Sequence, residues 1–133
     1  MSMIERPATA FSQDRPAKQK KPRVKDDAYL RWIRTLPCAV CFTRREIHAA
    51  HIRAPAPQYA KRGVGMAEKP DDAWTVPLCG QHHLFGEDAQ HKGEELAFWK
   101  RHGIDPFILA LSLHRVVGDA EAAEQIIKSA RPA

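Results

Sequence analysis

The sequence of 133 residues predicts a small α+β domain that is held together by a metal ion. Two pairs of metal-ligand residues carry this prediction, because each pair has the same two-residue gap: Cys38/Cys41 and Cys79/His82. Three thiols and one imidazole make the closed tetrahedral set that structural zinc requires. Two short strand-like segments accompany these pairs, and the other apolar residues recur at helical spacing. The core of so short a chain is small, so a bound metal would add stability.

The composition favours a protein of a reducing compartment that meets a polyanion. The formal net charge is +5, which suits a nucleic-acid partner but is also common in proteins without one. All three cysteines belong to the two ligand pairs, which favours metal binding over disulfides. The chain has no apolar leader typical of a signal peptide and no apolar run long enough to span a bilayer. We therefore expect a cytoplasmic protein without a membrane partner.

The N-terminal part divides into a leader and a first helix. Residues 1–25 are rich in Lys, Arg and Pro, so they are expected to form a disordered basic leader ahead of a domain over 26–131. The leader either keeps the chain soluble or adds DNA affinity through phosphate contacts. Residues 27–36 are predicted to form a helix, which Asp26 or Asp27 caps.

Two strands are predicted to flank a long connection. The first covers residues 47–53 and has His51 and Arg53 on one face and His48 on the other. The second covers residues 74–78 and leads into the second ligand pair. The connection between them is rich in Pro, Gly, Lys and Arg, and a connection of this length is usually functional or mobile.

The C-terminal third is predicted to be helical. Helices are expected over 94–102, where Gly103 follows the end, from Asp105-Pro106 onward, and over roughly 119–129. Their apolar positions are expected to cover the small core.

Three histidines remain outside the predicted zinc site. His83 directly follows the second ligand pair, His51 lies on the first predicted strand and His91 lies further along the chain. A single histidine of this kind is more often an ordinary surface residue. Three of them in a small metal-bound domain favour a functional role, either at a second metal or at a scissile phosphate.

At these positions the chain resembles the HNH nuclease superfamily, whose core is the ββα-metal or His-Me finger fold. The stretch from Leu36 to about Leu111 is particularly similar to a phage- and prophage-encoded group, in which the RecA-dependent Ref nuclease is a more distant relative. The similar phrases are Leu36-Pro37-Cys38, Ala49-Ala50-His51-Ile52-Arg53, Lys69-Pro70-Asp71-Asp72, Phe98-Trp99 and Gly103-Ile104-Asp105-Pro106. The resemblance implies a zinc-stapled ββα-metal core with flanking helices.

The resemblance also implies an activity, that of a metal-dependent DNA endonuclease. His51 matches the general base of the family, and Asp72 lies near the position that orients this base. His83 matches a catalytic residue that binds a divalent ion such as Mg²⁺, and His91 would be the last ligand of that ion. The structural zinc of many members matches Cys38, Cys41, Cys79 and His82.

The chemistry of phosphodiester hydrolysis suits these residue types. A neutral imidazole can take a proton from water at pH 7, and a divalent ion can stabilise charge on the scissile phosphate. Arg53 shares the predicted strand face of His51 and is a candidate phosphate ligand, although an exposed strand arginine is the ordinary alternative. The full set of candidate nucleic-acid contacts is Arg53, Lys61, Arg62 and Lys69.

Three departures from the family pattern affect the metal site. Many members have an Asp or His ligand immediately before the base, where this chain has Ala50. Asp72 stands in place of the usual asparagine. His91 follows His83 by eight residues rather than four, and eight residues of helix span about 12 Å. Either the intervening segment loops out and returns His91 to the site, or Glu87 takes its place.

Two other functions remain as alternatives. One is a non-catalytic zinc-stapled module that binds nucleic acid through its basic segments. The other is an adaptor to phage packaging or recombination proteins, with the C-terminal helices as its docking surface. The expected partner in the leading interpretation is double-stranded DNA.

Overall fold

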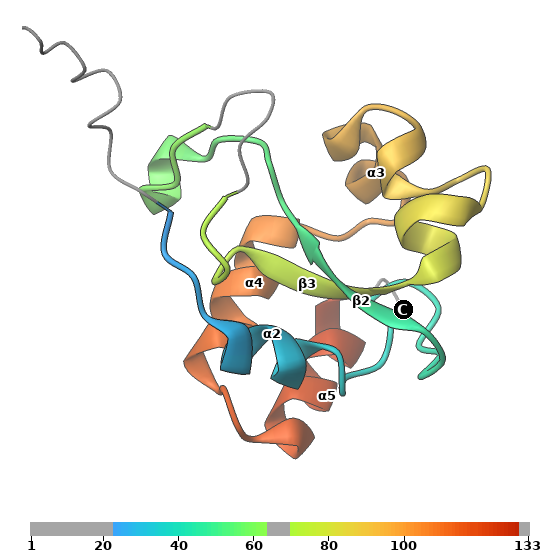
Figure 1. The fold of residues 1–133 in the computed structure, drawn as a ribbon. Coiled ribbons are helices and arrows are strands. Elements are labelled where there is room, and N and C mark those ends of the chain that lie inside the picture. The colour runs from blue at the N-terminus through green and yellow to red at the C-terminus, as the bar shows by residue number, and fades with distance from the viewer. Residues whose placement is uncertain (1–22, 64–69, 131–133) are drawn as a thin grey trace, which may run out of the picture.

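A two-stranded antiparallel sheet lies at the centre of the protein, and helices pack around it (Figure 1). The computed structural model describes residues 23–63 and 70–130. Strand β2 (Ile47–His51) pairs with β3 (Thr75–Cys79), so that Ile47 lies opposite Cys79 and His51 opposite Thr75. The α+β class predicted from the sequence is confirmed.

The helices follow the sequence pattern closely. They are α2 (Asp27–Ile33), η2 (Pro57–Tyr59), η3 (Gln81–Phe85), η4 (Gln90–Lys92), α3 (Glu95–Arg101), α4 (Pro106–Arg115) and α5 (Ala120–Ala130). Between the two candidate caps of α2 the structure selects Asp26, whose carboxylate accepts a hydrogen bond from the Tyr29 backbone N–H. Asp105 caps α4 in the same way, and Pro106 opens its first turn.

Two predicted elements end earlier than expected. Helix α2 stops at Ile33, and the chain reaches Leu36 through turns. Strand β2 stops at His51. The Ile52 N–H still donates to the Trp74 carbonyl, in the register of the sheet, but the Arg53 N–H donates to the Glu95 carboxylate instead of to β3. None of the helices in the described ranges is both long and apolar enough to cross a membrane.

The hydrophobic core lies between the sheet and helices α2, α4 and α5. Every residue of β3 is buried, because neighbouring elements cover both of its faces. The largest fully buried apolar side chains are Trp99, Phe98, Ile33, Leu36, Ile52, Leu78, Leu109, Leu113, Ile127 and Val76. This core packs against the hairpin, which carries His48, His51 and Cys79 of the candidate site.

The start of the described chain is bonded to the end of the long connection. The Val24 N–H donates to the Asp71 carboxylate at 2.7 Å, and the Asp72 N–H donates to the Val24 carbonyl at 3.0 Å. The expected leader over 1–25 therefore reaches too far, because Arg23 and Val24 contact the domain. The rest of that leader, residues 1–22, lies outside the described residues.

Candidate functional site

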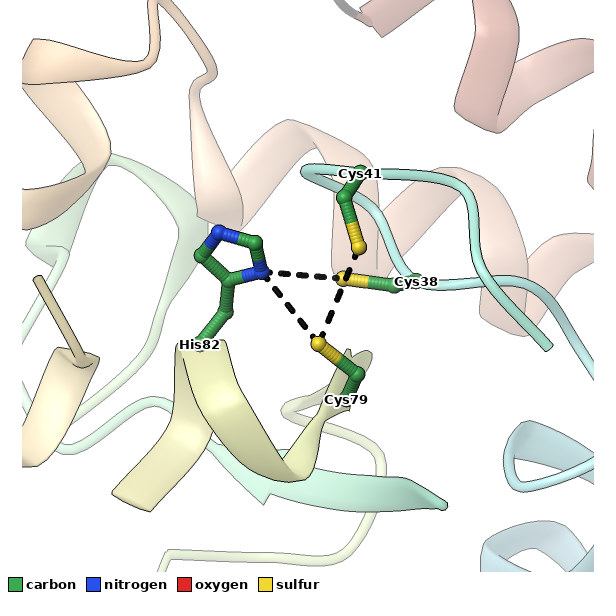
Figure 2. Close-up of side chains that lie close together, drawn as sticks. All are labelled: Cys38, Cys41, Cys79 and His82. Atoms are coloured by element: carbon green, nitrogen blue, oxygen red, sulfur yellow. Dashed lines mark hydrogen bonds between the residues drawn. The ribbon is translucent and has the colours of Figure 1, made fainter. Parts of the chain in front are cut away.

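Four metal-ligand atoms converge at one end of the hairpin. The ligand atoms of Cys38, Cys41, Cys79 and His82 all lie within 4.8 Å of one another (Figure 2). Cys41 Sγ is 3.7 Å from Cys79 Sγ, and His82 Nδ1 is 3.2 Å from Cys79 Sγ and 3.9 Å from Cys38 Sγ. Ligands of a tetrahedral zinc stand about 3.5–3.8 Å apart. The predicted Cys₃His cluster is confirmed, and its geometry fits structural zinc.

Local backbone geometry brings the two ligand pairs together. Cys38 and Cys41 lie on a tight turn, which closes through the Phe42 N–H donating to the Cys38 carbonyl at 2.9 Å. The Ala39 N–H donates to the Pro77 carbonyl at 2.9 Å, which ties this turn to β3. Cys79 is the last residue of β3, and His82 lies in the helical turn that follows.

That helical turn, η3, is π-helical and separates the two adjacent histidines. Such turns are rare and often occur at functional sites. His82 faces the thiols, whereas His83 faces strand β2, where its Nδ1 lies 2.8 Å from His48 Nδ1. The ring centroids of His83 and His91 are 4.8 Å apart. Three histidines thus form a second group, the histidine cluster, defined as His48, His83 and His91.

The chain between His83 and His91 loops out and returns. Asp88 anchors this loop to the end of α3, because its carboxylate accepts from Arg101 Nε at 3.0 Å and lies 2.8 Å from His102 Nε2. The loop brings His91, in η4, to the ring of His83. The alternative ligand Glu87 is exposed on the loop. The structure therefore brings together His83 and His91, and their role as ion ligands stays a prediction.

His51 is held by a buried carboxylate. Its Nε2 lies 2.9 Å from Asp72 Oδ1, and the Asp72 side chain has no exposed surface. The same oxygen accepts from Arg23 Nη1 at 2.6 Å, and Asp72 Oδ2 accepts from the Asp26 backbone N–H at 2.7 Å. The structure therefore brings Asp72 to His51, and its role in orienting a general base stays a prediction.

The electrostatic environment fixes the protonation states of two site residues. Burial raises the pKa of Asp72, but hydrogen bonds from the Asp26 N–H, His51 and Arg23 outweigh this effect and lower the pKa below its usual value. Asp72 is therefore a carboxylate at neutral pH. Burial, together with the charges of His91, His48 and His51, lowers the pKa of His83 to about 4. His83 is therefore a neutral imidazole at neutral pH.

The four candidate nucleic-acid contacts differ in how exposed their side chains are. Arg62 is exposed and Arg53 is half-buried just beyond β2, while Lys69 lies outside the described residues. Lys61 is only 3% exposed, and its ammonium lies 5.8 Å from the centre of the Trp74 ring. Burial lowers the pKa of Lys61. Lys61 does not expose its charge at the surface, so we no longer count it among the candidate nucleic-acid contacts.

Sequence reasoning missed three residues of the site. His48 lies on the same face of β2 as Ala50, opposite to the face of His51, and no spacing motif singles it out. Arg23 was counted with the leader, and Glu95 carried no signal. Glu95 accepts from the backbone N–H groups of Arg53 and Ala54, each at 2.9 Å, and so ties α3 to the chain just after His51.

We expect the Glu95→Ala substitution to lower the free energy of unfolding by about 2 kcal/mol. Two backbone N–H groups lose a charged acceptor. A hydrogen bond to a charged group contributes roughly 1.5–3 kcal/mol, and water can replace part of this contribution at the half-buried Glu95. Urea unfolding at pH 7 measures the change. The control is Glu87→Ala on the exposed loop, which should leave stability unchanged. Equal stability of the two variants would contradict the structural role of Glu95.

The fold and the site together define a class of protein: a small α+β domain with a closed Cys₃His metal site and a separate histidine cluster beside its hairpin. A model of the DUF968 family, whose members are described as proteins of unknown function, matches residues 5–118. The chain belongs to this family. No curated protein and no solved structure matches it.

Proposed function

We propose that the protein is a metal-dependent endonuclease that hydrolyses phosphodiester bonds of DNA. One observation carries the proposal: His51 is bonded to the fully buried carboxylate of Asp72, and it ends the strand β2 that also carries His48 of the histidine cluster. His51 is close enough to His83 to influence its pKa. A fixed imidazole beside candidate ion ligands is the arrangement that hydrolysis by an activated water needs. The resemblance to HNH nucleases in sequence supports the same activity.

His51 is the proposed general base. Asp72 is ionised and can only accept hydrogen bonds, so Nε2 of His51 carries the proton of their 2.9 Å contact. This tautomer puts the lone pair on Nδ1, from which the ring can take a proton from water. The Asp72 carboxylate also stabilises the imidazolium that results. Asp72 and, behind it, Arg23 are positioning residues.

His83 and His91 are the proposed ligands of a divalent ion such as Mg²⁺. The neutral state of His83 leaves a nitrogen lone pair for an ion, and the exposed His91 leaves one side open to a phosphate. Such an ion, when bound, would stabilise charge on the scissile phosphate and on the leaving 3′ oxygen. The Cys₃His cluster is separate from this ion site. Its four protein ligands would complete the tetrahedral coordination of a zinc ion and leave no open position.

Duplex DNA is the proposed substrate. Arg53 follows His51 by two residues, and the exposed Arg62 lies on the connection that precedes the second strand. With the formal net charge of +5, these guanidinium groups favour a polyanion over a neutral substrate. Phosphate contacts of this kind position DNA without reading its sequence.

The His51→Ala substitution tests the proposal. We expect the variant to relax supercoiled plasmid about 10²–10⁴-fold more slowly than the unmodified protein in Mg²⁺ or Mn²⁺, because general-base catalysis contributes a factor of this size. The matched control is His114→Ala, an exposed histidine of α4 outside the proposed site, which should keep full activity.

The outcome separates the proposed function from its main alternative. Undiminished cleavage by His51→Ala would remove His51 as the base. DNA binding that persists in every histidine variant, without cleavage by the unmodified protein in any divalent metal, would favour the non-catalytic nucleic-acid-binding module.

A further inference from the structure

We infer that His48 is a third protein ligand of the divalent ion proposed at His83 and His91. The inference rests on the proposed function and adds to it a residue and a metal preference. It starts from one contact: the Nδ1 atoms of His48 and His83 are 2.8 Å apart, with ring planes inclined at 75°. The Nδ1 atoms of His48 and His83 thus face each other across a short gap.

The distance between these nitrogens suits a shared ion. Imidazole nitrogens bind transition ions at about 2.1 Å, so two of them on adjacent positions of one ion are about 3.0–3.4 Å apart. The two Nδ1 atoms need to separate by only a few tenths of an ångström to accept an ion.

The pairing of β2 with β3 brings His48 and His83 close together. His48 lies on β2 opposite Leu78 of β3, and His83 lies in the turn that begins directly after β3. Both residues are half-buried, so packing restricts their rings. A site whose ligands are already restricted loses little conformational entropy when an ion binds.

His48 compensates for the alanine at the family ligand position. Ala50 lies two residues further along β2, on the same face as His48, and its methyl group cannot bind an ion. Without His48, the ion would have only His83 and His91 as protein ligands. With His48, three imidazoles bind the ion, and the remaining positions are left for water and a phosphate oxygen.

Among the three proposed ligands, His91 has the side chain that can most easily change its conformation, because it is exposed. Within the described residues, only the Cys₃His group has three or more ligand atoms that all lie within 4.8 Å of one another. The ligand nitrogens of the histidine cluster are therefore too far apart, in this conformation, for all three to bind one ion. The His91 side chain is exposed, and its ring lies edge-on to His83 at 71°. Rotation of an exposed side chain is fast and costs little.

A site of three imidazoles also has a metal preference. Imidazole suits Ni²⁺, Co²⁺ and Zn²⁺, whereas Mg²⁺ prefers carboxylate and water oxygens. We therefore expect the site to bind Ni²⁺ at least tenfold more tightly than Mg²⁺, because no carboxylate joins the three rings.

Calorimetric titration of Ni²⁺ into the full chain loaded with one zinc tests the role of His48. We expect His48→Ala and His83→Ala each to weaken Ni²⁺ binding by tenfold or more and His114→Ala to leave it unchanged. His48→Gln keeps a hydrogen-bonding amide, so it separates a ligand from a residue that only orients His83. Weakened binding in His48→Gln supports the ligand role, and full binding overturns it. Zinc content and circular dichroism confirm that each variant is folded.

The outcomes also separate this inference from the proposed function. If His83→Ala weakens Ni²⁺ binding and His48→Ala does not, His48 is not a ligand and the proposed ion site stands. If the unmodified protein binds no Ni²⁺ beyond its zinc, the inference is overturned, and plasmid cleavage by His51→Ala still decides the general base separately.

Discussion

Replacing Cys79 with serine is expected to unfold the domain at room temperature. Cys79 is a buried member of the Cys₃His cluster, and its Sγ lies 3.7 Å from Cys41 Sγ and 3.2 Å from His82 Nδ1. Structural zinc in small domains contributes roughly 10–16 kcal/mol to folding. The whole stability of a domain is about 5–15 kcal/mol, so loss of the zinc exceeds what the small core can supply.

Zinc content and thermal unfolding measure this effect together. The serine variant should retain well under one zinc per chain and show no cooperative thermal transition. The control is His83→Ala, which alters a half-buried neighbour of the zinc ligands but leaves the cluster intact. That variant should keep its zinc and its cooperative transition. A folded, zinc-free Cys79→Ser protein would show that the metal is dispensable for the fold.

Replacing Asp72 with alanine is expected to cost about 3 kcal/mol of stability at pH 7. The substitution leaves the Arg23 guanidinium, the His51 ring N–H and the Asp26 backbone N–H without their shared acceptor. Breaking a buried charged pair in this way usually costs roughly 3–5 kcal/mol, and the partial exposure of Arg23 reduces that figure.

The substitution should also change the response to acid. The pKa of Asp72 is lower in the folded protein than its ordinary value of about 3.9, because hydrogen bonds to the carboxylate outweigh its burial. The stability that Asp72 contributes is therefore fully present above pH 3.9 and is lost as the pH falls through the lower folded value. The alanine variant should lose less stability than the unmodified protein over this acid range.

Urea unfolding at pH 7 and at several pH values below 4 measures both effects. The matched control is Asp71→Ala, because Asp71 is only half-buried and its carboxylate accepts a backbone hydrogen bond from Val24 at an exposed position. This control should cost less stability and keep the acid response of the unmodified protein. If Asp72→Ala and Asp71→Ala behaved alike, the buried network around Asp72 would not be a main source of stability.

Some features were predictable because they depend on residues close together in the chain. A gap of two residues brings two ligands to the same turn, whatever the rest of the fold does. Helix caps are also local, since Asp26 and Asp105 bond to backbone groups two or three residues away. The Cys₃His cluster and most helices are therefore predictable from the sequence.

Features that depend on contacts between distant segments were missed or left open. Helical spacing alone put His91 about 12 Å from His83. The contact of their rings depends on a π-helical turn and on Asp88, which anchors the loop to α3. Periodicity gave the face of β2 on which His48 lies, but it does not say which residue packs against that face. Lys61 is predicted to be a surface cation, but packing buries it, with its ammonium 5.8 Å from the centre of the Trp74 ring.

By itself, therefore, the sequence determined the α+β class, the Cys₃His ligands and the separation of His82 from His83. The resemblance in sequence implied that Asp72 lies near His51, and the structure shows the contact between them. Only the tertiary structure decided that Arg23 supports this carboxylate and that His48 joins His83 and His91. The physical reason is the range of the interactions. Spacing and capping act within a few residues, whereas the histidine cluster and the buried carboxylate form where the packed core brings distant segments of the chain together.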